Sequence, residues 1–340
     1  HVLSDFTISP IIIGDIDTKK AHEIAQTLLD EYDEQTLFVI TTDLSHFYSL
    51  EQAEDIDGRI IDQITSLTVD ADTGFVLLNE VTAEAVNGIA VEAGTDVDIL
   101  ASTFDTATAA AGGDITVDAL GGNIFVSGTG VTSDGLARLT AAVDVDVLDS
   151  TIDAQDDVIV NAQGGSVDMT NTTATSATDV IDIDADQNVD ITDGYLEAEL
   201  DVEIDAANGY IFIDPTTIIS NSGSILATAA TNVDVTDSTL TADQDVTIEA
   251  TAGTADIESS TLTATNGLID ITAGDDIMVS RSDLDAGTTL TATAANDVDM
   301  LTSTLDALNN ITVEATAGYV NMESVDMTST AGAIDIDADT

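Results

Sequence analysis

Hydrophobic and polar residues alternate in short runs along most of the chain, and one apolar position recurs about every 22 residues. The steps between its occupants are 22 residues except for one of 21, and the occupants are Ile152, Ala174, Leu196, Ile218, Leu240, Leu262, Leu284, Leu305 and Met327. Repeats this short bury their apolar faces only against neighbouring repeats. The period therefore predicts a solenoid.

One repeat, residues 233–253, shows the expected unit. Three runs in it alternate apolar with polar residues, and the apolar members are Val233 and Val235, then Leu240 and Ala242, then Val246, Ile248 and Ala250. Alternation places one set of side chains inward and the other outward. We therefore predict three short strands and seven inward positions in each coil, with alanines fitting a narrow interior.

A longer repeat of about 44 residues is superimposed on the coils. In several alternate coils the third apolar run is displaced by one residue, and Gly165, Gly209 and Gly253 recur at 44-residue steps. Glycine suits a corner that needs positive φ or a close approach between backbones. We expect two corner shapes to alternate along the chain.

The repeats extend from about Leu67 to the last residue, and they lack helical periodicity. We predict a mainly β fold, a parallel β-helix solenoid of about twelve 22-residue coils. A right-handed coil is expected because parallel crossovers are almost always right-handed.

Residues 1–66 have a different pattern. Apolar strand-like runs occupy 6–13 and 37–40, and helical spacing occupies 18–32 and 53–64. This order predicts a small α/β segment with parallel strands. We expect two domains, 1–66 and 67–340.

The charge is extreme, with 65 acidic residues against five basic ones and a formal net charge of −60. Such a surface repels nucleic acid and anionic membranes, and it repels itself unless salt or divalent cations screen it. No apolar run is long enough to span a membrane. Neither nucleic-acid binding nor membrane insertion is expected, and the absence of cysteine excludes disulfides and thiolate metal sites.

The outward aspartates allow two interpretations. In the first, they are solvated strand and turn residues of a protein from saline or calcium-rich surroundings. In the second, the run Asp182, Asp184, Asp186 and Asp190 forms a calcium ladder of oxygen ligands. The Gly-rich calcium nonapeptide of other β-rolls is absent, which favours the first interpretation. We expect no required cofactor, and weak distributed Ca²⁺ binding on the acidic face.

Two repeat units, VDVTDSTLTADQDVTIEATAG (233–253) and VDMLTSTLDALNNITVEATAG (298–318), resemble the filamentous haemagglutinin-type repeats of large secreted bacterial adhesins. The resemblance covers most of 67–340. It implies a right-handed parallel β-helix that is secreted or displayed at the cell surface. The function expected from it is a non-catalytic, monomeric rod that contacts a glycan or protein on a host or neighbouring cell.

The segment TTDLSHF (41–47), with FTISPIIIGDID (6–17) and AEDIDGRIIDQI (53–64), resembles the later part of the Memo-like family, relatives of ring-opening non-haem iron dioxygenases. The resemblance implies a cytoplasmic, metal-dependent protein. Asp43, Ser45 and His46 match the family's loop by position, and Ser45 stands where some members carry a metal-binding Cys. The loop follows the second predicted strand, where α/β folds place ligands.

Imidazole is a common metal ligand and a serine hydroxyl a poor one, so His46, with Asp43, is the metal candidate. The family's other metal-binding histidines have no counterpart upstream of Phe6. We therefore expect a truncated, inactive site in which His46 is an ordinary loop histidine. Because the two resemblances imply different compartments, we expect an artificial or mis-assembled fusion.

Two further functions stay open for the repeats. They contain no His, Cys, Trp or Lys, so catalysis would depend on carboxylates, as in a β-helix polysaccharide hydrolase. Threonines also flank the recurring core position and could stack into a ladder that binds ice or ordered water, although Thr is simply a good strand residue. These are Thr103, Thr151, Thr173, Thr217, Thr239, Thr261 and Thr304 before it and Thr175, Thr241 and Thr263 after it.

Overall fold

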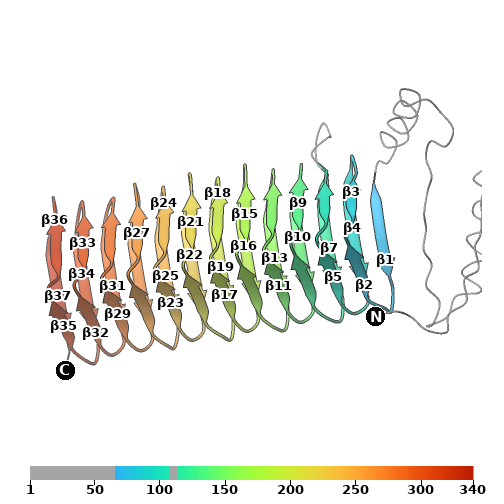
Figure 1. The fold of residues 1–340 in the computed structure, drawn as a ribbon. Coiled ribbons are helices and arrows are strands. Elements are labelled where there is room, and N and C mark those ends of the chain that lie inside the picture. Colours follow the sequence, from blue (N-terminus) through green and yellow to red (C-terminus); the bar gives the residue numbers. More distant parts are fainter. Residues whose placement is uncertain (1–65, 107–112, 340) are drawn as a thin grey trace, which may run out of the picture. The chain divides into compact units, whose positions relative to one another are not determined.

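The computed structural model describes residues 66–106 and 113–339, which form a stack of parallel strands (Figure 1). The described residues contain 37 strands and no helix. The predicted α/β segment, with Asp43, Ser45 and His46, lies outside them, apart from Ser66. The division into domains 1–66 and 67–340 therefore stays a prediction.

Each complete coil contributes one strand to each of three parallel sheets, which we call sheets A, B and C, and β37 adds one more strand to sheet A. Sheet A contains β1 (Leu67–Ala71), β4 (Gly88–Ala93), β7 (Asp114–Ala119), β10 (Ala137–Ala141), β13 (Val158–Ala162), β16 (Ile181–Ala185), β19 (Val202–Ala206), β22 (Ile225–Ala229), β25 (Val246–Ala250), β28 (Ile269–Ala273), β31 (Leu290–Ala294), β34 (Ile311–Ala315) and β37 (Ile334–Ala338).

Sheet B contains β2 (Val76–Asn79), β5 (Val97–Leu100), β8 (Ile124–Ser127), β11 (Val145–Leu148), β14 (Val167–Thr170), β17 (Val189–Thr192), β20 (Ile211–Asp214), β23 (Val233–Thr236), β26 (Ala255–Glu258), β29 (Ile277–Ser280), β32 (Val298–Leu301) and β35 (Val320–Glu323).

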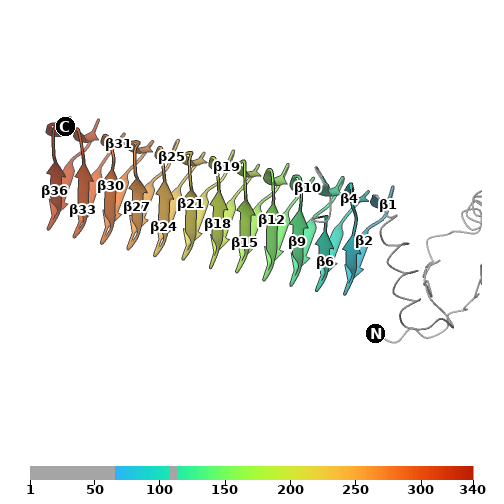
Figure 2. The same cartoon turned by 90° about the horizontal axis from the view of Figure 1, so that it is seen from above.

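Sheet C contains β3 (Thr82–Glu84), β6 (Thr103–Asp105), β9 (Gly130–Ser133), β12 (Thr151–Ala154), β15 (Thr173–Ser176), β18 (Tyr195–Ala198), β21 (Thr217–Ser220), β24 (Thr239–Ala242), β27 (Thr261–Ala264), β30 (Asp283–Ala286), β33 (Thr304–Ala307) and β36 (Asp326–Ser329). Figure 2 shows the strands of sheet C side by side along the stack. The predicted mainly β, parallel solenoid of about twelve coils is confirmed.

The recurring apolar position lies on the inward face of sheet C. Leu240 of β24 pairs with Ile218 on one side and Leu262 on the other, and all three side chains are fully buried. The predicted inward set of residues 233–250 is likewise buried. Stacking of identical positions on successive coils therefore builds one continuous apolar core.

The 44-residue repeat arises from the corners on either side of sheet A. Val158 of β13 pairs with Ile181, which is 23 residues later, and Ile181 pairs with Val202, which is 21 residues later. A four-residue corner precedes β16 and a three-residue corner follows it, whereas the order is reversed around β19. The predicted alternation of two corner shapes is confirmed.

Close approach, and not positive φ, explains the glycines of these corners. A Cβ on Gly165 would lie 2.7 Å from the Val143 carbonyl oxygen, and one on Gly253 would lie 2.6 Å from the Thr231 carbonyl oxygen. Neither glycine has positive φ. Their lack of a side chain lets one coil pack directly on the backbone of the preceding coil.

Apart from Gly88 at the beginning of β4, the described residues with positive φ lie in the turn between sheets B and C, and most of them carry side chains. These are Glu80, Ala101, Asp149, Asn171, Asp193, Asp237, Ser259, Arg281, Thr302 and Ser324, with Gly128 at the equivalent place. Pro215 occupies this place after β20 and has no positive φ, since its ring restricts φ to negative values. The sequence pattern did not predict this turn.

A column of buried hydroxyl groups follows the positive-φ position. Its members are Ser102, Thr129, Ser150, Thr172, Thr216, Ser238, Ser260, Ser282 and Ser303. The Ser238 hydroxyl donates to the Thr236 carbonyl oxygen at 2.6 Å and accepts from the Thr216 backbone N–H at 3.0 Å. The column thus satisfies backbone groups that the tight turn removes from the sheets.

Candidate binding surfaces

The outer face of sheet B carries a row of stacked carboxylates. Asp146 of β11, Asp168 of β14 and Asp190 of β17 are in register. Phe212 separates them from a second pair, Asp234 and Asp256. Because neighbouring strands lie about 4.8 Å apart, like charges repeat along this row at close spacing.

This acidic row is partly shielded from solvent, and its pKa values reflect that. Burial is the main cause that raises the pKa of Asp146, Asp190, Asp234 and Asp256. The Asp168 carboxylate raises the pKa of Asp146 further, whereas a 3.2 Å hydrogen bond from the Tyr210 hydroxyl opposes the shift at Asp190. Ionising these four carboxylates is therefore costly.

A second acidic group covers part of sheet A. Asp182 and Asp184 of β16 pair in register with Glu203 and Asp205 of β19. Burial, followed by the charges of Asp184 and Glu203, raises the pKa of Asp182 from 3.8 to about 6.

The run proposed from sequence as a calcium ladder does not form one column. Asp182 and Asp184 lie on sheet A, Asp186 lies in the following corner, and Asp190 lies on sheet B. Within residues 66–106 and 113–339, no group of three or more His, Cys, Asp or Glu residues is arranged to hold a metal ion. Residues stack on one another when they are one coil apart. Aspartates that follow each other within one coil therefore do not form a column.

Other aspartates have a structural role in the corners. The Oδ1 atoms of Asp144, Asp201 and Asp245 accept hydrogen bonds of 2.7–2.8 Å from backbone N–H groups of the next coil. Such bonds satisfy donors at the beginning of a strand. This supports the structural interpretation of part of the acidic composition.

Asparagine amides are frequent side-chain donors to the carboxylates of adjacent coils. Arg138 pairs with Asp118 at 3.1 Å, and Arg281 pairs with Glu258. Seven Asn amides donate to an Asp or Glu of an adjacent coil: Asn161 to Asp184, Asn171 to Asp149, Asn208 to Asp186, Asn221 to Glu197, Asn266 to Asp243, Asn296 to Asp275 and Asn321 to Asp299. A neutral donor thereby replaces the scarce cations.

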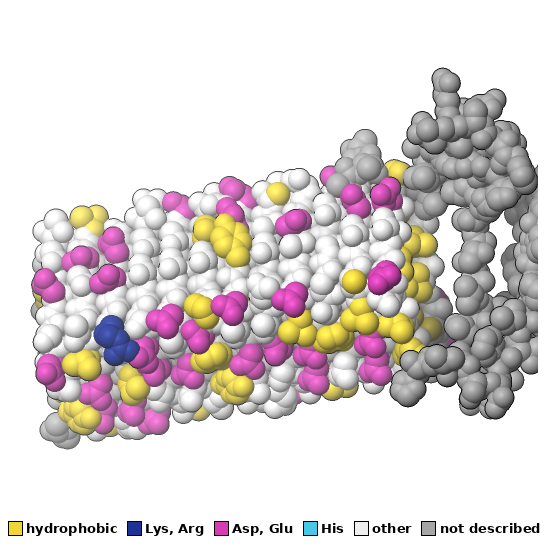
Figure 3. Space-filling model, viewed as in Figure 1, with side chains coloured by type: hydrophobic (Ala, Val, Ile, Leu, Met, Phe, Trp, Pro, Cys, Tyr) yellow, Lys and Arg dark blue, Asp and Glu magenta, His cyan; other side chains and the backbone are white. Residues whose placement is uncertain are grey.

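Threonines stack on the outer face of sheet C, as their spacing predicts. Thr239 pairs with Thr261, and Thr241 with Thr263. Asp283 and Asp285 follow on β30. The neighbouring Thr–x–Thr strands β24 and β27 therefore form a small uncharged area. Figure 3 shows acidic side chains spread between uncharged ones on one face of the stack.

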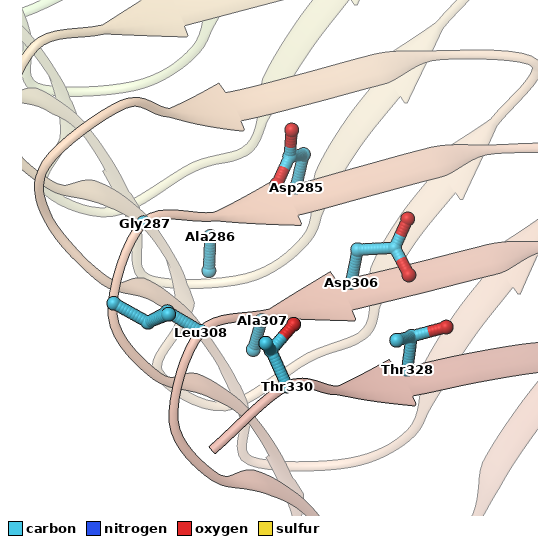
Figure 4. A pocket seen from close by; sticks show the side chains of 8 residues that line it. All are labelled: Asp285, Ala286, Gly287, Asp306, Ala307, Leu308, Thr328 and Thr330. Carbon is cyan, nitrogen blue, oxygen red and sulfur yellow. The ribbon is translucent and has the colours of Figure 1, made fainter. Parts of the chain in front are cut away.

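An open groove lies where β30, β33 and β36 of sheet C reach the corner that leads to sheet A (Figure 4). Asp285 and Asp306 are in register on neighbouring strands, and Leu308, Thr328 and Thr330 complete most of its lining. The two carboxylates face the same outer surface. They are a pair of neighbouring acids that borders this depression.

No helix long and apolar enough to cross a membrane is found among the described residues. A scan against protein-family models, a search of curated proteins and a search of solved structures find no match to the chain. Its function has to be inferred from the surfaces of the solenoid.

Proposed function

We propose that residues 67–340 act as a non-catalytic, adhesin-like rod that is secreted or displayed at a cell surface. The observation that carries this proposal is the continuous stacking of three parallel sheets, which gives extended outer faces over a single core. Long regular faces suit contacts with large partners, because each coil repeats nearly the same outward positions. The resemblance of the repeats to haemagglutinin-type adhesins supports the same function.

The charge and the outer residues define the partner chemistry. The acidic surface disfavours nucleic acid and anionic membranes. Outward Thr and Asp side chains offer hydroxyl groups and carboxylate acceptors, which suit a glycan or a protein with basic side chains. The rod is proposed to work as a monomer.

Weak cation binding is part of this proposal. Carboxylates that repeat about every 4.8 Å along the acidic row repel each other, and Ca²⁺ accepts oxygen ligands in flexible geometry. The ions would spread over many carboxylates, and no cofactor would be required for folding or adhesion.

A binding assay tests the adhesin function. The full-length chain is immobilised on beads and offered to a glycan array and to cells, with calcium and with chelator. We expect saturable binding to a glycan or cell-surface protein, and no release of sugar from acidic polysaccharides. Cleavage of those polysaccharides by the purified chain would overturn the non-catalytic proposal.

A polysaccharide hydrolase is the second candidate, because Asp285 and Asp306 border one groove. Paired carboxylates hydrolyse glycosides when one acts as an acid and the other as a base or nucleophile. The single variants Asp285→Asn and Asp306→Asn should then each abolish sugar release. Asp326→Asn, on the outer face of β36, is the matched control.

A further inference from the structure

Three Asn–Gly steps occur in the sequence, at Asn87, Asn208 and Asn266. Asn208 and Asn266 lie in four-residue corners between strands, whereas Gly88 is already the first residue of β4. Both corner asparagines are exposed to solvent. The two corners therefore share their length, their Asn–Gly sequence and an asparagine that water can reach.

Each corner asparagine sits directly on an aspartate of the preceding coil. The Asn208 backbone N–H donates to the Asp186 carbonyl oxygen, and its side-chain Nδ2 donates to Asp186 Oδ1, both at 2.9 Å. Asn266 makes the same two bonds to Asp243, at 2.8 and 2.7 Å. Two hydrogen bonds therefore anchor each corner asparagine to the preceding coil.

The following glycines have a free backbone nitrogen. Among the described residues, no acceptor is bonded to the N–H of Gly209 or Gly267, although the next residues, Tyr210 and Leu268, donate to a side chain of the preceding coil. A Cβ on either glycine would overlap the backbone of the preceding coil, at Gln187 or Gln244. The sites require glycine, which is also the residue that least obstructs attack by its own nitrogen.

We propose that Asn208 and Asn266 are sites of spontaneous deamidation. The glycine nitrogen attacks Cγ of the asparagine and forms a C–N bond. The Cγ–Nδ2 bond breaks, and ammonia leaves with the proton of the glycine nitrogen, which gives a succinimide. Water then opens either carbonyl of the ring and leaves aspartate or isoaspartate, so the chemistry needs water and no redox partner.

The modification changes the interaction with the preceding coil. At Asp186 and Asp243 an amide donor is lost and a second carboxylate takes its place. Like charges in neighbouring corners repel each other, and Arg138 and Arg281 are the only Lys or Arg residues in the described part of the chain to compensate. Deamidation therefore adds negative charge to the chain and weakens contacts between coils.

Peptide mapping by mass spectrometry tests the proposal on the folded full-length chain, incubated at mildly alkaline pH. Asn171 and Asn321 are internal controls, because their amides also donate to an aspartate of the preceding coil but Thr172 and Met322 follow them. Asn208 and Asn266 should convert at least about tenfold faster than these controls, since only glycine leaves the attacking nitrogen unobstructed. Aspartate and isoaspartate should both form.

Equal conversion at the four positions would overturn the proposal. So would conversion that occurs only in the denatured chain, because the corners would then protect the asparagines. The double variant Asn208→Gln and Asn266→Gln should stay a single species on anion exchange while the unsubstituted chain accumulates more acidic forms. If that variant does not fold, site-by-site mapping of the unsubstituted chain still decides.

Discussion

The side-chain amide of Asn171 donates a 2.7 Å hydrogen bond to the carboxylate of Asp149, and both residues have positive φ, of 48° and 49°. They occupy the same place in consecutive coils, in the turn from sheet B to sheet C. Asn and Asp tolerate this left-handed backbone better than most residues. Coils that place other residues there carry more strain in the same turn.

Thr302 is the β-branched residue at that place, with φ of 53°. We expect Thr302→Asn to raise the free energy of unfolding by about 0.5–1 kcal/mol. The left-handed conformation costs most residues about 1–2 kcal/mol, and the cost is smaller for Asn because its short polar side chain can hydrogen-bond locally. Urea unfolding followed by circular dichroism measures the change. Thr304→Asn in the extended backbone of β33 is the control and should give no gain; an unchanged midpoint for Thr302→Asn would contradict the assignment of strain.

Substitution of Ser238 tests whether the column of buried hydroxyl groups stabilises the coils. Ser238→Ala leaves the Thr216 N–H without its acceptor inside the turn, and we expect a loss of about 1–3 kcal/mol of stability. Ser222→Ala removes an exposed hydroxyl that donates to Glu199, so its effect should stay within about 0.5 kcal/mol. Equal effects of the two substitutions on the thermal midpoint would show that the column does not stabilise the coils.

The raised pKa of Asp182 predicts how the stability of the folded chain depends on pH. The pKa of Asp182 is raised in the folded chain from 3.8 to about 6, so between these values the folded chain binds more protons than the unfolded chain. Stability from this group therefore falls as pH rises from about 4 to about 6 and is constant above that. Asp182→Asn should raise the urea midpoint at neutral pH and have less effect near pH 4.

The control for Asp182 is Asp283→Asn, which removes one charge from the exposed outer face of sheet C. It corrects for the general benefit of lowering the net charge. A gain from Asp182→Asn that is no larger than the control at neutral pH, or that does not grow between pH 4 and 6, would contradict the role of burial and neighbouring charge at this site.

Salt should stabilise the coils, because the carboxylates of neighbouring strands lie only about 4.8 Å apart. The screening length is about 10 Å at 0.1 M salt and about 3 Å at 1 M, so screening between coils becomes effective only at high salt. We expect the thermal midpoint to rise steadily with NaCl, and to rise more with CaCl₂ at equal ionic strength. A midpoint that does not respond to either salt would rule out repulsion between coils as a significant cost.

The architecture follows from the residue pattern, since Leu240 and its equivalents at 22-residue steps can be buried together only in a solenoid. The pattern also determined the alternation of corners, through the displaced third strand and glycines such as Gly253. Both features are local patterns repeated at a fixed interval, and side-chain alternation along a strand is a property of the backbone. The pattern of Thr239 and Thr261 predicted their stacking for the same reason.

Which charged groups meet depends on how the coils pack. The stack Asp146, Asp168 and Asp190 was readable at 22-residue spacing, but the register of sheet B was needed to separate it from Asp182 on sheet A. The turn with positive φ at residues as different as Asp237 and Arg281 has no single residue signature. The contacts of Asn208 with Asp186 likewise depend on corner geometry, because stacking brings together residues that are distant in the chain and fixes their distances only once the coils are packed.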